Sequence, residues 1–195
     1  MSNQTIADLE QQLQHGEAVN PDGFPPVHLW HPGSCGAMDL RIKRDGSWWY
    51  QGSPIQRQAM VKLFARILRR EENGDYVLVT PVEKIRIFVD DAPLLVNQAY
   101  QQWQDAMPVI FMETSTGDTF RLDATHALWV NTDPVTQEPS PYVHVRAHLH
   151  ALIGRNVFYN LVDWAIPVQH LPTGRQELIL ESAGEQFSLG FCDEV

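Results

Sequence analysis

The order strand, helix, β-hairpin occurs twice along this chain, and this repeat restricts its possible folds more than any other feature of the sequence. Aligning residues 55–68 with residues 153–166 places Arg57 on Arg155. A self-similar order of elements indicates an internal duplication. We therefore expect an α+β fold whose duplicated core consists of two similar half-domains. The alternative is that a helix followed by a hairpin is a common motif that occurs here twice without duplication.

Turn and capping signals define the expected elements. Asp45-Gly46 is a strong hairpin signal, and Ser53-Pro54 has the composition of a helix N-cap followed by proline at the first helical position. Residues 142–150 alternate apolar and polar side chains, as a half-buried strand does. The expected helices cover residues 4–14, 53–70 and 154–166, and the expected strands cover 38–43, 47–51, 76–80, 84–90, the two sides of a turn at 116–118, 126–131, 142–150, 177–182 and 186–191.

These elements predict three segments. Residues 1–36 hold an N-terminal helix and a proline-rich lead-in, residues 37–105 form the first half-domain, and residues 106–195 form the second. A chain of 195 residues is long enough to bury a hydrophobic core without disulfides or a structural metal.

The whole chain is acidic, with a formal net charge of −10 at pH 7. Phosphate backbones and anionic lipid repel such a protein, so we expect neither a nucleic-acid polymer nor a membrane surface as a partner. Hydrophobic residues make up 44% and charged residues 19% of the chain, which excludes a disordered protein. No secretory signal and no apolar run of roughly 20 residues is present in the sequence, so we expect a cytoplasmic protein.

Basic residues are concentrated between residues 41 and 86, where ten Lys and Arg accompany five Asp and Glu. One interpretation is that these charges solvate exposed faces and pair with the acidic remainder. The other is a local site for an anionic ligand. Charge alone favours the first interpretation.

Two arginines are candidate residues for a site that binds an anionic ligand. Arg57 and Arg155 both fall on the apolar side of their expected helices, in the first turn. A buried charge without a partner is costly, so each guanidinium needs an anion. That anion is either a protein carboxylate, which makes the arginine structural, or a ligand phosphate or carboxylate at the helix N-terminus.

The other candidate groups carry weaker signals. Neither group of histidines has a further set of ligands at the spacing of a zinc site, so we expect no metal. The sequence has no glycine-rich phosphate loop, nucleophile elbow or zinc-protease motif, so we expect no catalytic residue and no cofactor. The two groups are His144, His148 and His150 on the expected strand, and His28 and His31 with Cys35 in the proline-rich lead-in.

The sequence from Leu40 to Pro93 resembles that of a bacterial family, domain of unknown function 1285 (DUF1285). The stretch Pro141 to Arg146 and several residues between 149 and 161 also fit, so the resemblance covers nearly the whole chain after the first two dozen residues. The matching elements are Arg41-Ile42, Asp45-Gly46, Trp48, Gly52, Pro54-Ile55, Arg57, Leu63-Phe64, Leu68 to Glu71, Tyr76, Leu78 to Pro81, Glu83-Lys84, Ile87 and Asp90 to Pro93.

The resemblance implies two half-domains, the second superficially similar to pleckstrin-homology-like folds. It also implies a ligand site at the interface of the halves, a nucleotide-like ligand and a role in bacterial signal transduction. The family has no assigned catalytic residues.

We therefore expect a cytoplasmic ligand-binding module rather than an enzyme. Arg57 and Arg155 would neutralise the ligand, and an aromatic ring would stack on it. The alternatives are a protein–protein interaction adaptor, whose partner would be a signalling protein, and a hydrolase that uses His144, His148 or His150. The other expected ligand-binding residues are Thr80, Glu83 and Lys84 as hydrogen-bonding groups, and Trp48 or Tyr159 as the stacking ring.

Overall fold

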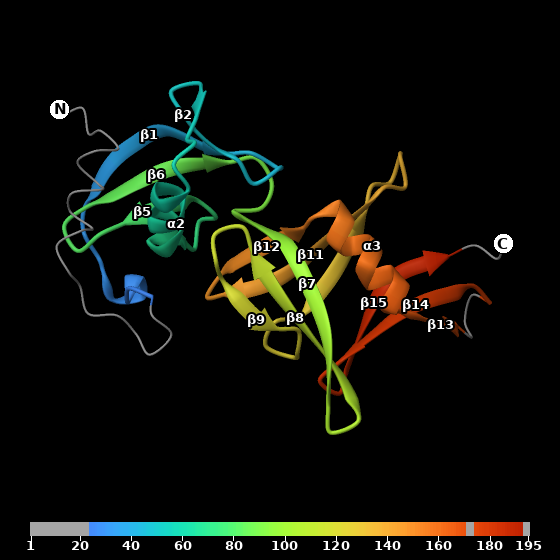
Figure 1. The fold of residues 1–195 in the computed structure, drawn as a ribbon. Coiled ribbons are helices and arrows are strands. Elements are labelled where there is room, and N and C mark those ends of the chain that lie inside the picture. The colour runs from blue at the N-terminus through green and yellow to red at the C-terminus, as the bar shows by residue number, and fades with distance from the viewer. Residues whose placement is uncertain (1–23, 171–173, 193–195) are drawn as a thin grey trace. The chain divides into compact units, whose positions relative to one another are not determined.

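The structure, a computed structural model, describes residues 24–170 and 174–192 (Figure 1). The chain divides into two compact units, Met1–Asp91 and Ala92–Val195, which are called the N-terminal and C-terminal units below. The helix expected at residues 4–14 lies outside the described residues. The division after Asp91 comes earlier than the expected one between residues 105 and 106, which falls inside a β-hairpin of the C-terminal unit.

The N-terminal unit is a six-stranded sheet with one α-helix. Its strands lie in the order β3-β2-β1-β6-β5-β4, and only the β1–β6 pair is parallel. Its elements are η1 (Val27–Leu29), β1 (Ser34–Ile42), β2 (Trp48–Tyr50), β3 (Ser53–Pro54), α2 (Gln58–Arg66), β4 (Leu68–Arg70), β5 (Tyr76–Val79) and β6 (Lys84–Val89).

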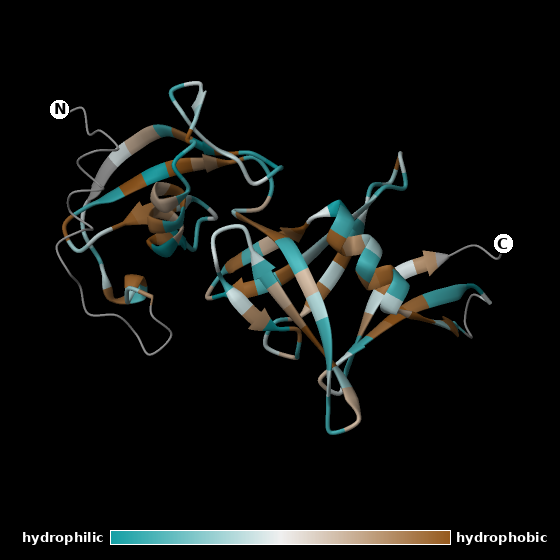
Figure 2. Ribbon diagram, viewed as in Figure 1, coloured by the Kyte–Doolittle hydropathy of each residue, from teal (hydrophilic) through white to brown (hydrophobic). Residues whose placement is uncertain are grey.

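The core of this unit lies between α2 and one face of the sheet. Side chains alternate along a strand, so β1 turns Leu40 and Ile42 to this face, and both are fully buried. Trp48 of β2 lies opposite Ile42 and packs against Phe64 of α2, with 6.4 Å between ring centroids. Hydrophilic and hydrophobic residues alternate along the first part of β6 in Figure 2, as this arrangement requires.

The C-terminal unit contains a second six-stranded mixed sheet, one α-helix and a small antiparallel sheet. The large sheet has the order β10-β11-β12-β7-β8-β9, with β12 and β7 parallel, and the small one has the order β13-β14-β15. Its elements are β7 (Leu94–Gln104), β8 (Met107–Thr114), β9 (Thr119–Arg121), β10 (Leu128–Thr132), β11 (Pro139–Arg146), β12 (Leu149–Ile153), α3 (Arg155–Trp164), β13 (Ile166–Gln169), β14 (Gln176–Ser182) and β15 (Glu185–Cys192).

The described chain is therefore mostly β with two short helices, rather than the more evenly mixed α+β fold that we expected. The expectation of two similar halves is confirmed, because each unit has a six-stranded mixed sheet with one parallel pair of strands. The likeness of the second half to pleckstrin-homology-like folds stays a prediction. No helix in the part of the chain that the structure describes is long and apolar enough to cross a membrane.

The helix expected at residues 53–70 is shorter than predicted. Gln51 and Gly52 both have positive φ angles, of 48° and 76°, and form a tight turn. Ser53 and Pro54 then pair with β2 as an edge strand, where a proline is tolerated because its missing N–H faces away from the sheet. The helix begins only after Arg57, which is its N-cap residue, and the chain returns to the sheet as β4.

The single strand expected at residues 142–150 is two strands joined by a turn at Ala147, whose φ is 46°. Val145, Ala147 and Leu149 continue the apolar–polar alternation of the sequence through the turn, although Ala147 itself is exposed. The period of the sequence therefore could not reveal the hairpin.

Candidate ligand-binding site

The face of the N-terminal sheet that points away from α2 is called the outer face here. Because Ile85 and Ile87 are buried on the α2 side, the alternate residues of β6, which are Lys84, Arg86 and Phe88, lie on the outer face. This face therefore combines two cations and an aromatic ring on a central strand of the sheet.

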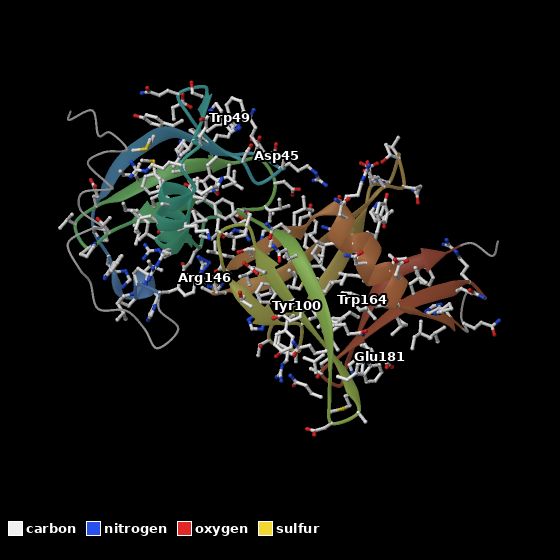
Figure 3. The ribbon with its side chains drawn as sticks, viewed as in Figure 1. Asp45, Trp49, Tyr100, Arg146, Trp164 and Glu181 are labelled. Atoms are coloured by element: carbon white, nitrogen blue, oxygen red, sulfur yellow. The ribbon has the colours of Figure 1, made fainter. Side chains whose placement is uncertain are left out.

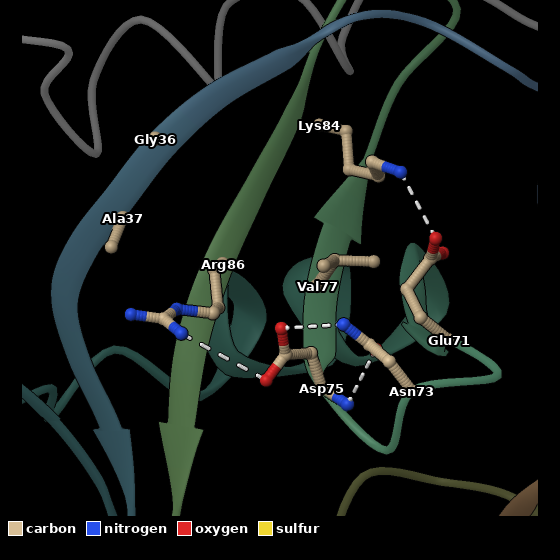
Figure 4. A pocket seen from close by; sticks show the side chains of 8 residues that line it. All are labelled: Gly36, Ala37, Glu71, Asn73, Asp75, Val77, Lys84 and Arg86. Atoms are coloured by element: carbon tan, nitrogen blue, oxygen red, sulfur yellow. Dashed lines mark hydrogen bonds and ion pairs between the residues drawn. The ribbon is translucent and has the colours of Figure 1, made fainter.

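A pocket of about 380 Å³ opens on the outer face. Figure 4 shows it with β1 and β6 along one side and the turn between β4 and β5 along the other. Two cations, two carboxylates and one amide surround a small apolar floor. The lining residues are Gly36, Ala37, Glu71, Asn73, Asp75, Val77, Lys84 and Arg86.

Glu71 is held between two cations at the wall of the pocket. Its Oε2 accepts a hydrogen bond from Nζ of Lys84 at 2.9 Å, and its Oε1 accepts one from Nε of Arg69 at 2.7 Å. Burial alone would raise the pKa of Glu71, but the hydrogen bonds and charges of Lys84 and Arg69 outweigh it and hold the pKa below its ordinary value. Glu71 is therefore an ionised acceptor at neutral pH.

Asp75 and Arg86 form the second pair in the pocket, and this pair is loose. Nη1 of Arg86 lies 3.9 Å from Oδ1 of Asp75, which is near the outer limit for an ion pair. Asp75 also accepts a hydrogen bond from Nδ2 of Asn73 at 3.0 Å and donates its own N–H to Oδ1 of Asn73. The amide holds the carboxylate in place, whereas the guanidinium has no short contact with it.

Backbone geometry gives the pocket its room and its shape. The β1–β6 pairing shifts register between Ser34 and Ala37, and Gly36 in this bulge has a φ of 96°. A Cβ on Gly36 would have no atom within 4 Å, so the space above it is open. On the other side, Gly74, with a φ of 90°, closes the turn by donating to the carbonyl of Glu71 at 3.0 Å. Bulges of this kind are common beside binding sites.

Of the three hydrogen-bonding residues expected at the site, only Lys84 lines the pocket. Thr80 and Glu83 are buried in the turn between β5 and β6. The Thr80 N–H donates to the Glu83 carbonyl at 2.9 Å, and the Thr80 hydroxyl accepts from the Glu83 N–H at 3.2 Å. These two residues thus build the turn from which Lys84 starts β6.

The expectation that Arg57 and Arg155 point inward is wrong, because both are exposed. Arg57 precedes the first turn of α2, so a helical wheel does not describe its direction. The Arg155 side chain is 71% exposed and pairs with Glu138 at 2.6 Å. Neither guanidinium is a buried charge that requires a ligand anion.

The two rings expected to stack on the ligand have opposite environments. Trp48 is 2% exposed and belongs to the core, so it cannot offer a face to a ligand. Tyr159 is exposed on α3 of the C-terminal unit. The alternation along β2 places Trp49, rather than Trp48, on the outer face.

Two of the candidate histidines, His144 and His150, make contacts within the C-terminal unit. Nδ1 and Nε2 of His144 lie 2.9 Å and 2.6 Å from the carbonyl oxygens of Thr125 and Ala147. His150 packs against the rings of Trp129 and Tyr142. Among the described residues, no group of three or more His, Cys, Asp and Glu side chains is placed to hold a metal ion.

Family models match both units of the chain. The N-terminal domain of the DUF1285 domain of unknown function matches residues 25–92, and the C-terminal domain of the DUF1285 protein of unknown function matches residues 93–189. The chain belongs to the DUF1285 family. The boundary between the two family domains lies within one residue of the boundary between the two compact units.

Solved structures of two other DUF1285 proteins resemble this chain. A family protein from Silicibacter pomeroyi DSS-3 is 40% identical, with a TM-score of 0.83, and the match covers 97% of each chain. A family protein from Shewanella baltica OS155 is 30% identical, with a TM-score of 0.51, and the match covers 64% of this chain and 90% of that one. The comparison with curated proteins gave no match.

Proposed function

We propose that this DUF1285 protein is a non-catalytic module that binds a small, nucleotide-like anionic ligand in the pocket of its N-terminal unit. The observation that carries the proposal is the pocket itself, in which Lys84 and Arg86 of one strand both line an open volume of about 380 Å³. That volume suits a small molecule and lies in the usual range for ligand pockets.

The ion pairs of the pocket support an exchange with a ligand. A phosphate or carboxylate that enters replaces Asp75 as the partner of Arg86, and the loss is small because the existing contact of 3.9 Å is long and half-exposed. Glu71 and Asp75 then accept hydrogen bonds from ligand hydroxyl groups. A molecule with both an anionic group and hydroxyls, such as a sugar phosphate or a nucleotide, satisfies both sets of side chains.

The interface of the two halves, with Arg57, Arg155 and Tyr159 as contacts, stays a prediction as an alternative location for the ligand. A role in signalling is a further step of the same proposal, since it requires that ligand binding changes what another protein recognises.

The test is thermal unfolding of the full chain with a panel of mono-, di- and cyclic nucleotides, with phosphate and sulfate as controls. A ligand at 100 times its dissociation constant stabilises the protein by about 2.7 kcal/mol, which raises Tm by several degrees. We expect a shift from nucleotides that the simple anions do not reproduce. A flat panel would contradict the proposal.

Matched variants connect the shift to the pocket. Lys84→Gln and Arg86→Gln should each weaken binding about tenfold, or ~1.4 kcal/mol, because each removes a charge-assisted hydrogen bond. Lys62→Gln is the control, since Lys62 is an exposed lysine of α2 outside the pocket. Equal affinity in all three variants would place the ligand elsewhere.

A protein–protein interaction adaptor is the second candidate, and the β7–β8 hairpin favours it. Tyr100 stacks on Phe111 of the facing strand, with 5.4 Å between ring centroids, and Met107 lies further along the same face of the hairpin. Tyr100 and Met107 are both exposed. Exposed apolar side chains that lie together are often interaction sites. The double variant Tyr100→Ser/Met107→Ser should abolish binding of a partner without changing any nucleotide shift, whereas an adaptor that uses another surface would keep its partner.

A further inference from the structure

A row of three side chains crosses the outer face beside the pocket. Arg41 of β1 pairs in register with Trp49 of β2 on one side and with Phe88 of β6 on the other. Residues paired across strands point to the same face, so these three side chains lie next to one another on the outer face. Figure 3 labels Trp49 on the N-terminal unit.

Phe88 is the accessible ring of this row. Its side chain is 37% exposed, and two guanidiniums flank it: Cζ of Arg41 lies 5.3 Å and Cζ of Arg86 lies 5.8 Å from the ring centroid. Trp49 has Nζ of Lys43 at 3.4 Å from its own ring. The cations thus lie against both rings, and Phe88 is the more exposed of the two aromatic residues.

Arg86 connects the row to the pocket. Its side chain lines the pocket near Asp75 and also lies over Phe88. Residues two apart on a strand are separated by about 6.6 Å, so Phe88 lies one residue pair beyond the pocket wall formed by Arg86 and Ala37. A ligand bound in the pocket can therefore reach the ring without crossing the sheet.

We propose that Phe88, flanked by Arg41 and Arg86, is the subsite for a planar heteroaromatic ring, and that the ligand is therefore a nucleotide rather than a sugar phosphate. This inference rests on the proposed function, because it uses the same pocket. The phosphate pairs with Lys84 and Arg86, the sugar hydroxyls donate to Glu71 and Asp75, and the base stacks on Phe88 and on the guanidinium planes. Stacking on an aromatic ring tolerates any base, so Phe88 selects for a ring rather than for one base.

The experiment is calorimetric titration of the full chain with the four ribonucleoside 5′-monophosphates and with ribose 5-phosphate, which lacks the ring. At least one nucleotide should bind about tenfold more tightly than ribose 5-phosphate, because only the nucleotide stacks. Phe88→Leu should remove that tenfold difference and leave the affinity for ribose 5-phosphate unchanged, and Phe88→Tyr should restore it.

The matched control is Phe191→Leu in the C-terminal unit. Phe191 is exposed to a similar degree and also lies under a guanidinium, with Cζ of Arg175 5.1 Å from its ring centroid. This variant should change no affinity.

The outcomes separate the two proposals. If ribose 5-phosphate binds as tightly as every nucleotide, or if Phe88→Leu binds the nucleotide as the unaltered chain does, the ring subsite is wrong while the proposed function stands. If neither the nucleotides nor ribose 5-phosphate binds, the proposed function and this inference both fail.

Discussion

Trp48 and Trp49 are neighbours on β2, but their side chains lie on opposite faces of the sheet. Trp48 packs against Phe64 in the core, whereas Trp49 lies on the outer face beside Lys43 and Arg41. Successive side chains of a strand point to opposite faces, so the pair could not share one role.

Trp48→Ala should destabilise the chain by about 3–5 kcal/mol, because it leaves a large cavity beside Phe64. Trp49→Ala removes a partly exposed ring and should cost much less. Denaturant unfolding followed by circular dichroism measures both. Equal losses in the two variants would contradict the assignment of Trp48 to the core.

Glu71 predicts a pH dependence of stability. Its pKa is below the ordinary value of 4.5 in the folded chain, so the ionised form is favoured there by Lys84 and Arg69. Its contribution to the free energy of unfolding is therefore fully present above about pH 4.5 and is lost as the pH falls through the lower folded pKa.

Glu71→Gln should remove that part of the acid sensitivity. The free energy of unfolding of the variant and of the unaltered chain, measured between pH 7 and pH 3, should differ most at neutral pH and converge in acid. A difference that grows as the pH falls would contradict the pairing.

At the scale of elements, the pocket depends on two short irregular segments, the bulge at Gly36 and the turn from Glu71 to Asp75. Asp45-Gly46 predicted its hairpin correctly because Gly46, with a φ of 79°, supplies the left-handed residue of the turn, and Oδ1 of Asp45 accepts a hydrogen bond from the N–H of Ser47 at 2.9 Å. Ser53-Pro54 led to a wrong prediction of the start of the helix, because the preceding turn at Gln51-Gly52 returns the chain to the sheet.

The Lys84-x-Arg86-x-Phe88 alternation could have placed these three side chains on one face from the sequence alone. The partners Glu71 and Asp75 could not have been assigned, because strand order brings their turn to β6. The eleven-residue β7 was missed for a different reason: its second half is rich in glutamine and lacks the β-branched residues that indicate a strand.

Gly154 tests an element boundary in the C-terminal unit. It is the N-cap residue of α3, its N–H donates to the carbonyl of Val96 at 2.9 Å, and a Cβ there would lie 3.0 Å from that oxygen. Gly154→Ala should therefore destabilise the chain by about 1–2 kcal/mol.

Gly33→Ala is the control for this prediction, since a Cβ on Gly33 has no atom within 4 Å. Thermal unfolding of the two variants should show a loss for Gly154→Ala only. If Gly154→Ala left the unfolding temperature unchanged, β7 and α3 would separate more easily than the structure indicates.

At the scale of the whole molecule, each unit has its own six-stranded sheet, and each corresponds to one DUF1285 domain. The sequence predicted this likeness of the halves because the order of elements survives even where residue identities do not. It did not predict the outer face as a site, because the argument from the two arginines assumed that both helices bury their first turns. Arg57 in fact precedes α2, and Arg155 is exposed at the start of α3.

The central claim is that the outer face of the N-terminal unit binds a nucleotide. Amide hydrogen exchange of the full chain, with and without the ribonucleoside monophosphate that gives the largest thermal shift, tests it most directly. We predict slower exchange at residues 36–37, 71–77 and 84–88, absent in Arg86→Gln and retained in Lys62→Gln. Protection confined to the C-terminal unit, or protection that Arg86→Gln does not remove, would contradict the claim.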